Sequence, residues 1–274
     1  MMSLDSMASG RRPPTSSWSV SWQIQRRVIG ALLMREVVTR YGRHNIGILW
    51  LVVEPMLFTL GVAALWQVAR MHSLSTIPVI GFAITGYSSV LLWRNASNRC
   101  AKAIEPNLSL LYHRQVKVLD IFAARILLEL AGATGSFIIL SLLFIGLGAL
   151  QQPVDLLAVI AGWLLLCWFS AALGLIVGAV SERSEVFERV WHIVTYLMFP
   201  LSGAVYMVHW LPKQAQDVVL WIPMAHGVEW MRHGFFGSTI PTYEQPLYFV
   251  VCNLGMTLIG LALARQTARS VRPE

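Results

Sequence analysis

Two carboxylates stand inside otherwise apolar stretches of the sequence and are the first candidates for chemistry. Glu54 lies early in the apolar run 46–69, and Glu129 lies just inside the run 126–150. An ionised side chain is costly to hold in lipid, so such residues normally face a helix bundle or water and find a cation. A structural ion pair and a role in transport both stay open, with three candidate partners at the same membrane level: Arg94, Arg99 and Arg125. Since no paired base and nucleophile lie nearby, neither carboxylate indicates catalysis.

The other reactive residue types lack the spacing of a metal or nucleotide site. Three cysteines lie far apart, and three histidines share one segment without metal-ligand spacing: Cys100, Cys167 and Cys252; His209, His226 and His233. We interpret the cysteines as reduced packing residues and expect no metal. The sequence has no G-x-x-x-x-G-K-[ST] loop to cradle phosphates, so we expect no ATP hydrolysis and no bound cofactor in this chain.

The elements that position these residues follow from the composition. Of the 274 residues, 56% are hydrophobic and 13% are charged, whereas a soluble domain carries about 25% charged residues. This excludes a soluble globular or disordered chain and indicates an all-α polytopic membrane protein. A helix needs about 20 apolar residues to cross a bilayer, and six runs qualify: Ile46 to Ala69, Ile77 to Trp93, Ile126 to Leu150, Val154 to Val180, Val190 to Val208 and Leu247 to Ala264.

The basic residues predict the orientation of these spans. Seven Lys and Arg residues precede the first span, six follow the second, two follow the fourth and three lie in the tail, so 18 of 21 fall on one side. Cytoplasmic loops carry the excess of Lys and Arg. Both termini are therefore predicted to be cytoplasmic, and the net charge of +7 is an orientation signal that argues against nucleic acid as a partner.

The N-terminal region divides into a flexible tail, 1–17, and a cytoplasmic interfacial helix, 18–45. Apolar residues recur in 18–43 near helical spacing, with arginines between them. Such a helix can lie in the membrane interface while its arginines reach lipid phosphates; the alternative is a solvated helix that only precedes the membrane domain. The candidate contacts to lipid or phosphate are Arg26, Arg27, Arg35, Arg40 and Arg43.

Two segments between spans are predicted to be helical without crossing the membrane. In the loop after span two, Asn107 can cap a short helix over about 107–117 with an exposed apolar face for a partner protein, or the helix packs under its own bundle. The second segment, 206–246, is apolar and aromatic but broken by Pro and Gly, which predicts two short helices, about 213–221 and 224–236, in a re-entrant hairpin on the outer side. Residues 265–274 form a basic cytoplasmic tail.

Residues 35–41, Arg-Glu-Val-Val-Thr-Arg-Tyr, followed by 47–55 with the pattern Gly-x-x-Trp-x-x-x-x-Pro, resemble the N-terminal signature of ABC-2 type transporter permeases. The whole layout, 46–264, is similar to that six-helix domain, and most similar to the permeases that export capsular polysaccharide from Gram-negative bacteria. The resemblance implies a homodimer in the inner membrane that works with two copies of a separate ATPase holding ATP and magnesium. A periplasmic export protein is a further candidate partner.

The same resemblance assigns roles to particular residues. It makes 107–117 a coupling helix that docks on the ATPase and moves spans one to three, with the contact residues Asn107, Leu108, Leu111, Tyr112 and Arg114. A sugar polymer also needs a wet path with aromatic rings for stacking, and the dimer interface is the expected place. The candidate lining residues are Tyr87, Trp93, Tyr196, Tyr206, Trp210 and Trp230; ordinary packing is the alternative for each.

Other interpretations stay open. An exporter of O-antigen, teichoic acid or a small molecule would share the layout. A stand-alone channel or secondary transporter would show internal repeats with matched broken helices, and none is visible. Gly174 and Gly178 permit close helix approach in span four, either within one subunit or across the dimer.

Overall fold

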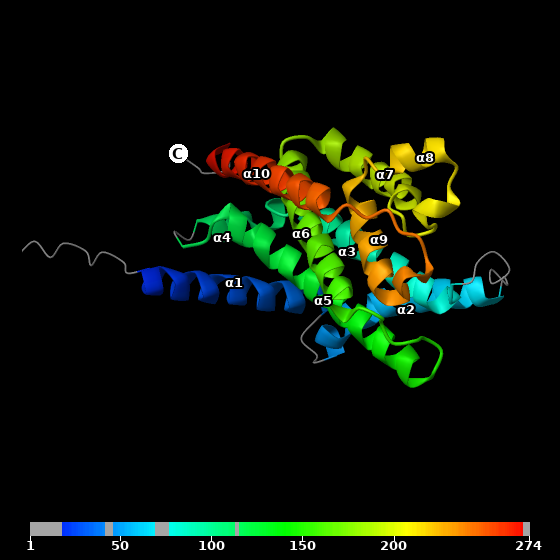
Figure 1. Cartoon of the computed structure of the whole chain (residues 1–274). Coiled ribbons are helices and arrows are strands. Elements are labelled where there is room, and N and C mark those ends of the chain that lie inside the picture. The colour runs from blue at the N-terminus through cyan, green and yellow to red at the C-terminus, as the bar shows by residue number, and fades with distance from the viewer. Residues whose placement is uncertain (1–17, 42–45, 69–76, 113–114, 271–274) are drawn as a thin grey trace, which may run out of the picture.

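The computed structural model describes residues 18–41, 46–68, 77–112 and 115–270, and in those ranges the chain forms helices and their connections without a strand. The predicted tail 1–17, as well as Arg43 and Arg114, lie outside the described residues. The helices pack into one bundle from which α1 (Trp18–Tyr41) projects, as Figure 1 shows.

The six predicted spans correspond to six long helices. These are α2 (Ile46–Val68), α3 (Val79–Cys100), α5 (Val118–Gly146), α6 (Leu156–Ser181), α7 (Glu185–Leu201) and α10 (Pro246–Ser270). Four of them, α2, α5, α6 and α10, are long and apolar enough to cross a membrane among the residues described. The chain is therefore an all-helical polytopic membrane protein.

The other two of these six helices, α3 and α7, are not among the four, and each has its own physical reason. Most of α3 is buried by the rest of the chain, so its serines and threonines need not meet lipid. Helix α7 has 17 residues with Pro200 near its end. The predicted fifth span to Val208 is wrong at its end, because the chain leaves the helix at Leu201 and turns at Gly203, whose φ of +80° favours glycine.

The core lies between α3, α5, α6 and α9 (Pro223–Phe236). Trp163 of α6 stacks on Phe137 of α5 with ring centroids 4.4 Å apart. Small residues on α6 permit this close packing: a Cβ on Gly178 would lie 2.6 Å from Phe122, and one on Gly162 would lie 2.9 Å from the backbone of α9. The close approach at Gly178 is therefore made within one subunit.

The two predicted short helices of 206–246 are present as α8 (Lys213–Val219) and α9, with short 3-10 turns, η3 (Val208–Trp210) and η4 (Gly237–Thr239), on either side. The predicted helix over 107–117 is shorter than expected: η2 (Glu105–Asn107) leads into α4 (Leu108–Leu111). The backbone N–H of Lys117 donates to the Asp120 carboxylate at 2.9 Å. This holds Lys117 in an extended conformation at the start of α5, so the earlier helix cannot continue to 117.

Candidate functional site

Helix α1 is attached to the bundle by polar side chains. Gln25 donates to Asp120 of α5, and the Arg125 guanidinium of α5 lies 3.4 Å from the Glu36 carboxylate. Arg35 donates to Asn107, the last residue of η2, which directly precedes α4. These contacts fix α1 both to α5 and to the segment that was predicted to contact an ATPase.

The two intramembrane carboxylates meet a shared cation. Arg40 pairs with Glu129 and also lies 3.1 Å from Glu54, while Arg99 lies 3.5 Å from Glu129. Glu129 is 5% exposed and Glu54 is 47% exposed. Arg99 is one of the three partners expected from the sequence, but the main partner is Arg40, which the sequence analysis gave as a candidate for lipid or phosphate contact.

The other predicted cations lie elsewhere. Arg125 pairs with Glu36, and Arg94 lies over the Phe58 ring at 5.5 Å. Among the described candidates for lipid contact, Arg26 and Arg27 are exposed on α1, whereas Arg35 and Arg40 are engaged with protein groups. The structure therefore divides the arginines into two that face outward and two that hold α1 in place.

Residues 105–112, which we call the coupling segment, present an apolar outer surface. Leu108 is exposed and Tyr112 is 77% exposed, while Leu111 packs against the core. Asn107 precedes α4 but does not cap it; its amide donates to the Ala103 carbonyl oxygen at 2.8 Å and its oxygen accepts from Arg35. The exposed apolar side chains are available to a partner, and Asn107 fixes the segment to the chain.

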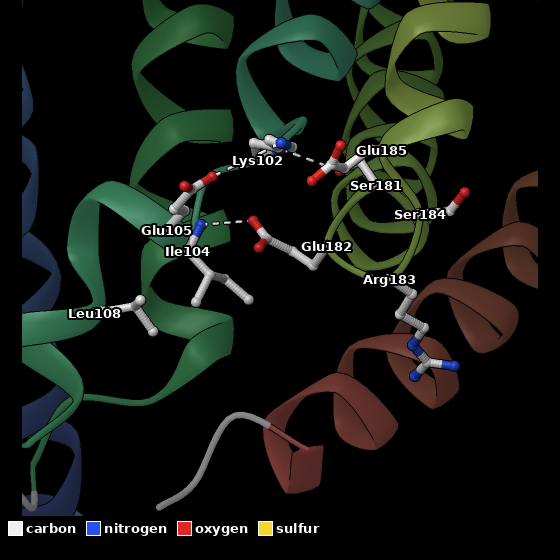
Figure 2. A pocket seen from close by; sticks show the side chains of 9 residues that line it. All are labelled: Lys102, Ile104, Glu105, Leu108, Ser181, Glu182, Arg183, Ser184 and Glu185. Atoms are coloured by element: carbon white, nitrogen blue, oxygen red, sulfur yellow. Dashed lines mark hydrogen bonds and ion pairs between the residues drawn. The ribbon is translucent and has the colours of Figure 1, made fainter.

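A hollow of about 430 Å³ separates the coupling segment from the turn between α6 and α7 (Figure 2). The backbone N–H of Ile104 donates to the Glu182 carboxylate at 2.7 Å, and that of Lys102 donates to the Ser181 hydroxyl at 3.1 Å. Burial raises the pKa of Glu182, and the hydrogen bond from Ile104 acts in the opposite direction. The C-terminus of α6 is therefore bonded directly to the backbone that leads into the coupling segment.

Lys102 extends this connection to α7. Its ammonium lies 3.4 Å from Glu188 in the first turn of α7 and 3.8 Å from Glu105. The sequence analysis did not single out this turn; the signal was the run Ser-Glu-Arg-Ser-Glu at 181–185 between two apolar helices. No nucleophile contacts a base in this arrangement. Its hydrogen bonds and ion pairs connect the coupling segment with α6 and α7.

The aromatic candidates for a polymer path fall into three groups by exposure. Tyr87 packs against Trp66 and Phe199, and Trp93 is 1% exposed, so neither faces an open path in this conformation. Tyr196 is 71% exposed and Trp210 is 41% exposed. The remaining two are half-buried: Tyr206 and Trp230.

A buried cation in α9 was missed by the sequence analysis, which placed it only as one of three basic residues on the outer side. Arg232 is fully buried and donates to three carbonyl oxygens, of Gly203 at 2.7 Å, Ala204 at 2.8 Å and Tyr206 at 2.7 Å. Its guanidinium carbon lies 3.9 Å from the centroid of the Phe82 ring. The available signal was a Glu-x-x-Arg pair, Glu229 and Arg232, inside an apolar segment.

A metal centre is not formed by the part of the chain that the structure describes, which contains no group of three or more His, Cys, Asp or Glu side chains that could hold an ion. The polar groups at the coupling end are ion pairs and backbone anchors. The described residues therefore form a membrane helix bundle with an exposed apolar segment beside these polar anchors.

The family is shown by comparison with known proteins. The model of the family described as ABC-2 type transporter matches residues 27–236, and the chain belongs to this family. It is 47% identical over 260 residues to the capsule polysaccharide export inner-membrane protein CtrC of Neisseria meningitidis serogroup B, covering 95% of this chain and 98% of that protein.

Two further relatives carry similar descriptions. The capsule polysaccharide export inner-membrane protein BexB of Haemophilus influenzae is 44% identical over 259 residues, or 94% of this chain and 98% of that protein. The polysialic acid transport protein KpsM of Escherichia coli is 30% identical over 247 residues, or 89% of this chain and 95% of that protein. The similarity thus extends over nearly the whole chain.

Proposed function

We propose that this chain is the permease subunit of an ATP-driven exporter that moves capsular polysaccharide, lipid-linked and acidic, across the bacterial inner membrane. The observation that carries the proposal is the near full-length similarity to CtrC and BexB, which are described as capsule polysaccharide export inner-membrane proteins. The chain itself is non-catalytic, and ATP with its magnesium is held by a separate ATPase subunit.

The proposed topology has six spans, α2, α3, α5, α6, α7 and α10, with α8 and α9 as a re-entrant hairpin on the outer side. The distribution of Lys and Arg supports cytoplasmic termini. The hydrogen bonds of Arg232 support the hairpin, because they satisfy backbone carbonyls in the turn after α7 that lipid could not satisfy.

The proposed assembly is a homodimer with two ATPase copies, and a periplasmic export protein would continue the path. The middle of one subunit is filled by side chains such as Trp93 and Arg232, so passage between two subunits suits a polymer better than passage through one. Exposed aromatic residues, Tyr196 and Trp210, are the strongest remaining candidates to line that path.

Coupling to ATP hydrolysis is proposed to begin at the coupling segment. Leu108 and Tyr112 would dock on the ATPase as apolar anchors. Movement there reaches α1 through Asn107 and Arg35, and reaches α6 and α7 through Glu182 and Lys102. The sequence analysis expected transmission to spans one to three; the hydrogen bonds add α6 and α7.

A pair of substitutions, Leu108→Asp with Tyr112→Asp, tests the docking. We expect loss of ATPase co-purification and of ATPase stimulation, because two apolar anchors become charged while no buried side chain of the permease changes. Tyr243→Asp, an exposed tyrosine in the segment after α9, is the matched control and should retain both. Normal coupling in the double variant would reject the assignment of the coupling segment.

The cargo is tested by deleting the gene and immunostaining the cell surface. Loss of capsular polysaccharide, restored by the wild-type gene, is the expected result. Unchanged capsule together with loss of O-antigen, teichoic acid or a small exported molecule would favour the corresponding alternative cargo. Transport by the purified chain in vesicles without an ATPase would instead identify a stand-alone channel or secondary transporter.

A further inference from the structure

A second cavity, of about 460 Å³, lies between the start of α5 and the last turns of α10. Leu111 of the coupling segment contributes to its wall. Figure 1 shows the C-terminal end of α10 near α4, so the cavity opens at the same end of the bundle as the coupling segment. Its volume is within the range of about 300–1,000 Å³ that pockets for small molecules occupy.

The cavity has an apolar interior and a basic rim. Buried Val118 and Ala264 line it together with the more exposed Leu119 and Leu261. Three exposed cations complete the lining: Lys117, Arg265 and Arg269. The site therefore presents positive charge directly beside uncovered hydrocarbon surface.

The three cations are available for an anion. No ion pair joins any of them to a carboxylate among the residues that the structure describes. Asp120, which lies one turn beyond Lys117, interacts electrostatically with the Lys117 ammonium, but its carboxylate accepts hydrogen bonds from Gln25 and from the backbone N–H of Lys117. Arg265 and Arg269 are four residues apart on one helix face, where like charges repel each other, so an anion between them would relieve that repulsion.

The lining matches an amphiphile better than a soluble anion. A free phosphate would use the rim and leave the leucines uncovered, whereas an acyl chain would cover Leu119 and Leu261. Basic pockets between the cytoplasmic ends of transmembrane helices bind anionic headgroups. We propose that this cavity holds one anionic phospholipid of the cytoplasmic leaflet, with its phosphate between Lys117, Arg265 and Arg269 and one chain against the two leucines.

The bound lipid joins α10 to the segment between the coupling segment and α5, because the cations come from both sides of the cavity. The assignment to the cytoplasmic leaflet rests on the proposed orientation. The binding itself does not depend on the cargo, so it can fail or succeed independently of the proposed export function.

The test is titration of the purified full-length chain in neutral detergent with phosphatidylglycerol, with bound lipid counted by native mass spectrometry. A triple variant, Lys117→Gln, Arg265→Gln and Arg269→Gln, should bind one phosphatidylglycerol about 100-fold more weakly, since each basic residue near a membrane surface contributes about a factor of five. The matched control removes two exposed cations elsewhere, Arg189→Gln and Lys213→Gln, and should stay within about twofold of wild type.

A second variant separates the lipid chain from the headgroup. Ala268→Leu fills the cavity without changing its charge, and should weaken phosphatidylglycerol binding about tenfold or more while leaving the weak binding of glycerol 1-phosphate unchanged. An equal loss per removed charge in the control variant would show that general charge, and no specific site, binds the lipid. Glycerol 1-phosphate binding as tightly as phosphatidylglycerol, or an unaffected Ala268→Leu variant, would also overturn the proposal.

Discussion

The buried guanidinium of Arg232 gives the sharpest stability prediction. Its nitrogens donate to the carbonyl oxygens of Gly203, Ala204 and Tyr206, all in the turn that follows α7. Replacement by Lys keeps the charge but offers one ammonium group in place of a planar fork. We expect Arg232→Lys to retain one of the three bonds and to leave two carbonyls unsatisfied.

The magnitude follows from those two carbonyls. A buried polar group without its partner costs about 1–3 kcal/mol, so with two such carbonyls the free energy of unfolding should fall by about 2–6 kcal/mol. Arg232→Met, which also removes the charge, leaves all three carbonyls unsatisfied and should be at least as destabilising. The matched control is Arg189→Lys, because Arg189 is exposed on α7 and should change stability by less than about 0.5 kcal/mol.

Two measurements check this prediction. Thermal unfolding in detergent should show a lower midpoint for Arg232→Lys by on the order of 10 °C. Hydrogen exchange should become faster at residues 203–208, the turn that Arg232 holds, before it changes in α6. A midpoint and an exchange pattern equal to those of Arg189→Lys would refute the view that the guanidinium fixes the turn.

Three further substitutions test other contacts. Gly178→Ala should lower the free energy of unfolding by about 1–3 kcal/mol, because the new Cβ would lie 2.6 Å from Phe122. The control is Gly146→Ala, where nothing lies within 4 Å of the new Cβ. Equal unfolding midpoints for the two variants would contradict the close contact at Gly178. Glu129→Ala should cost about 3–5 kcal/mol, because it leaves Arg40, whose side chain is 13% exposed, without its main partner. The exposed Glu54→Ala should cost less than about 1 kcal/mol, and denaturant titrations that give the same loss for both variants would contradict this ranking. Glu182→Ala removes the acceptor for the Ile104 N–H, so ATPase stimulation by the permease should fall several-fold. The control variant Glu185→Ala should have little effect. Unchanged stimulation in Glu182→Ala would show that the contact between the α6–α7 turn and the backbone before the coupling segment does not transmit coupling.

The positions of the long helices could be predicted because the thickness of the bilayer sets a length that an apolar run must reach. The ends were harder to predict where a single contact decides them. Asp155 and Ser184 accept backbone N–H groups at the starts of α6 and α7, as N-cap residues do. The start of α5 depends on the hydrogen bond between Lys117 and Asp120, and a pattern of apolar residues does not predict such a bond.

The candidate site likewise combines features that the sequence could predict with contacts that it could not. Exposure of Leu108 and Tyr112 agrees with the surface that the sequence predicted for a partner. The link from Ile104 to Glu182 joins residues far apart in the chain, and no spacing rule connects them. The aromatic candidates proved to be buried, half-buried or exposed, which the sequence could not predict because membrane helices are apolar around much of their circumference. Periodicity therefore does not identify the helix face that meets protein.

The amino-acid sequence by itself determined that this protein is a helical membrane protein, which segments are long and apolar enough to form its helices, and which end carries the basic residues, because composition and run length respond directly to the bilayer. Only the tertiary structure decided that Arg40 forms an ion pair with Glu129 and that Arg232 donates hydrogen bonds to the turn after α7. These are contacts between separate helices, and the packing of the whole bundle fixes which side chains meet.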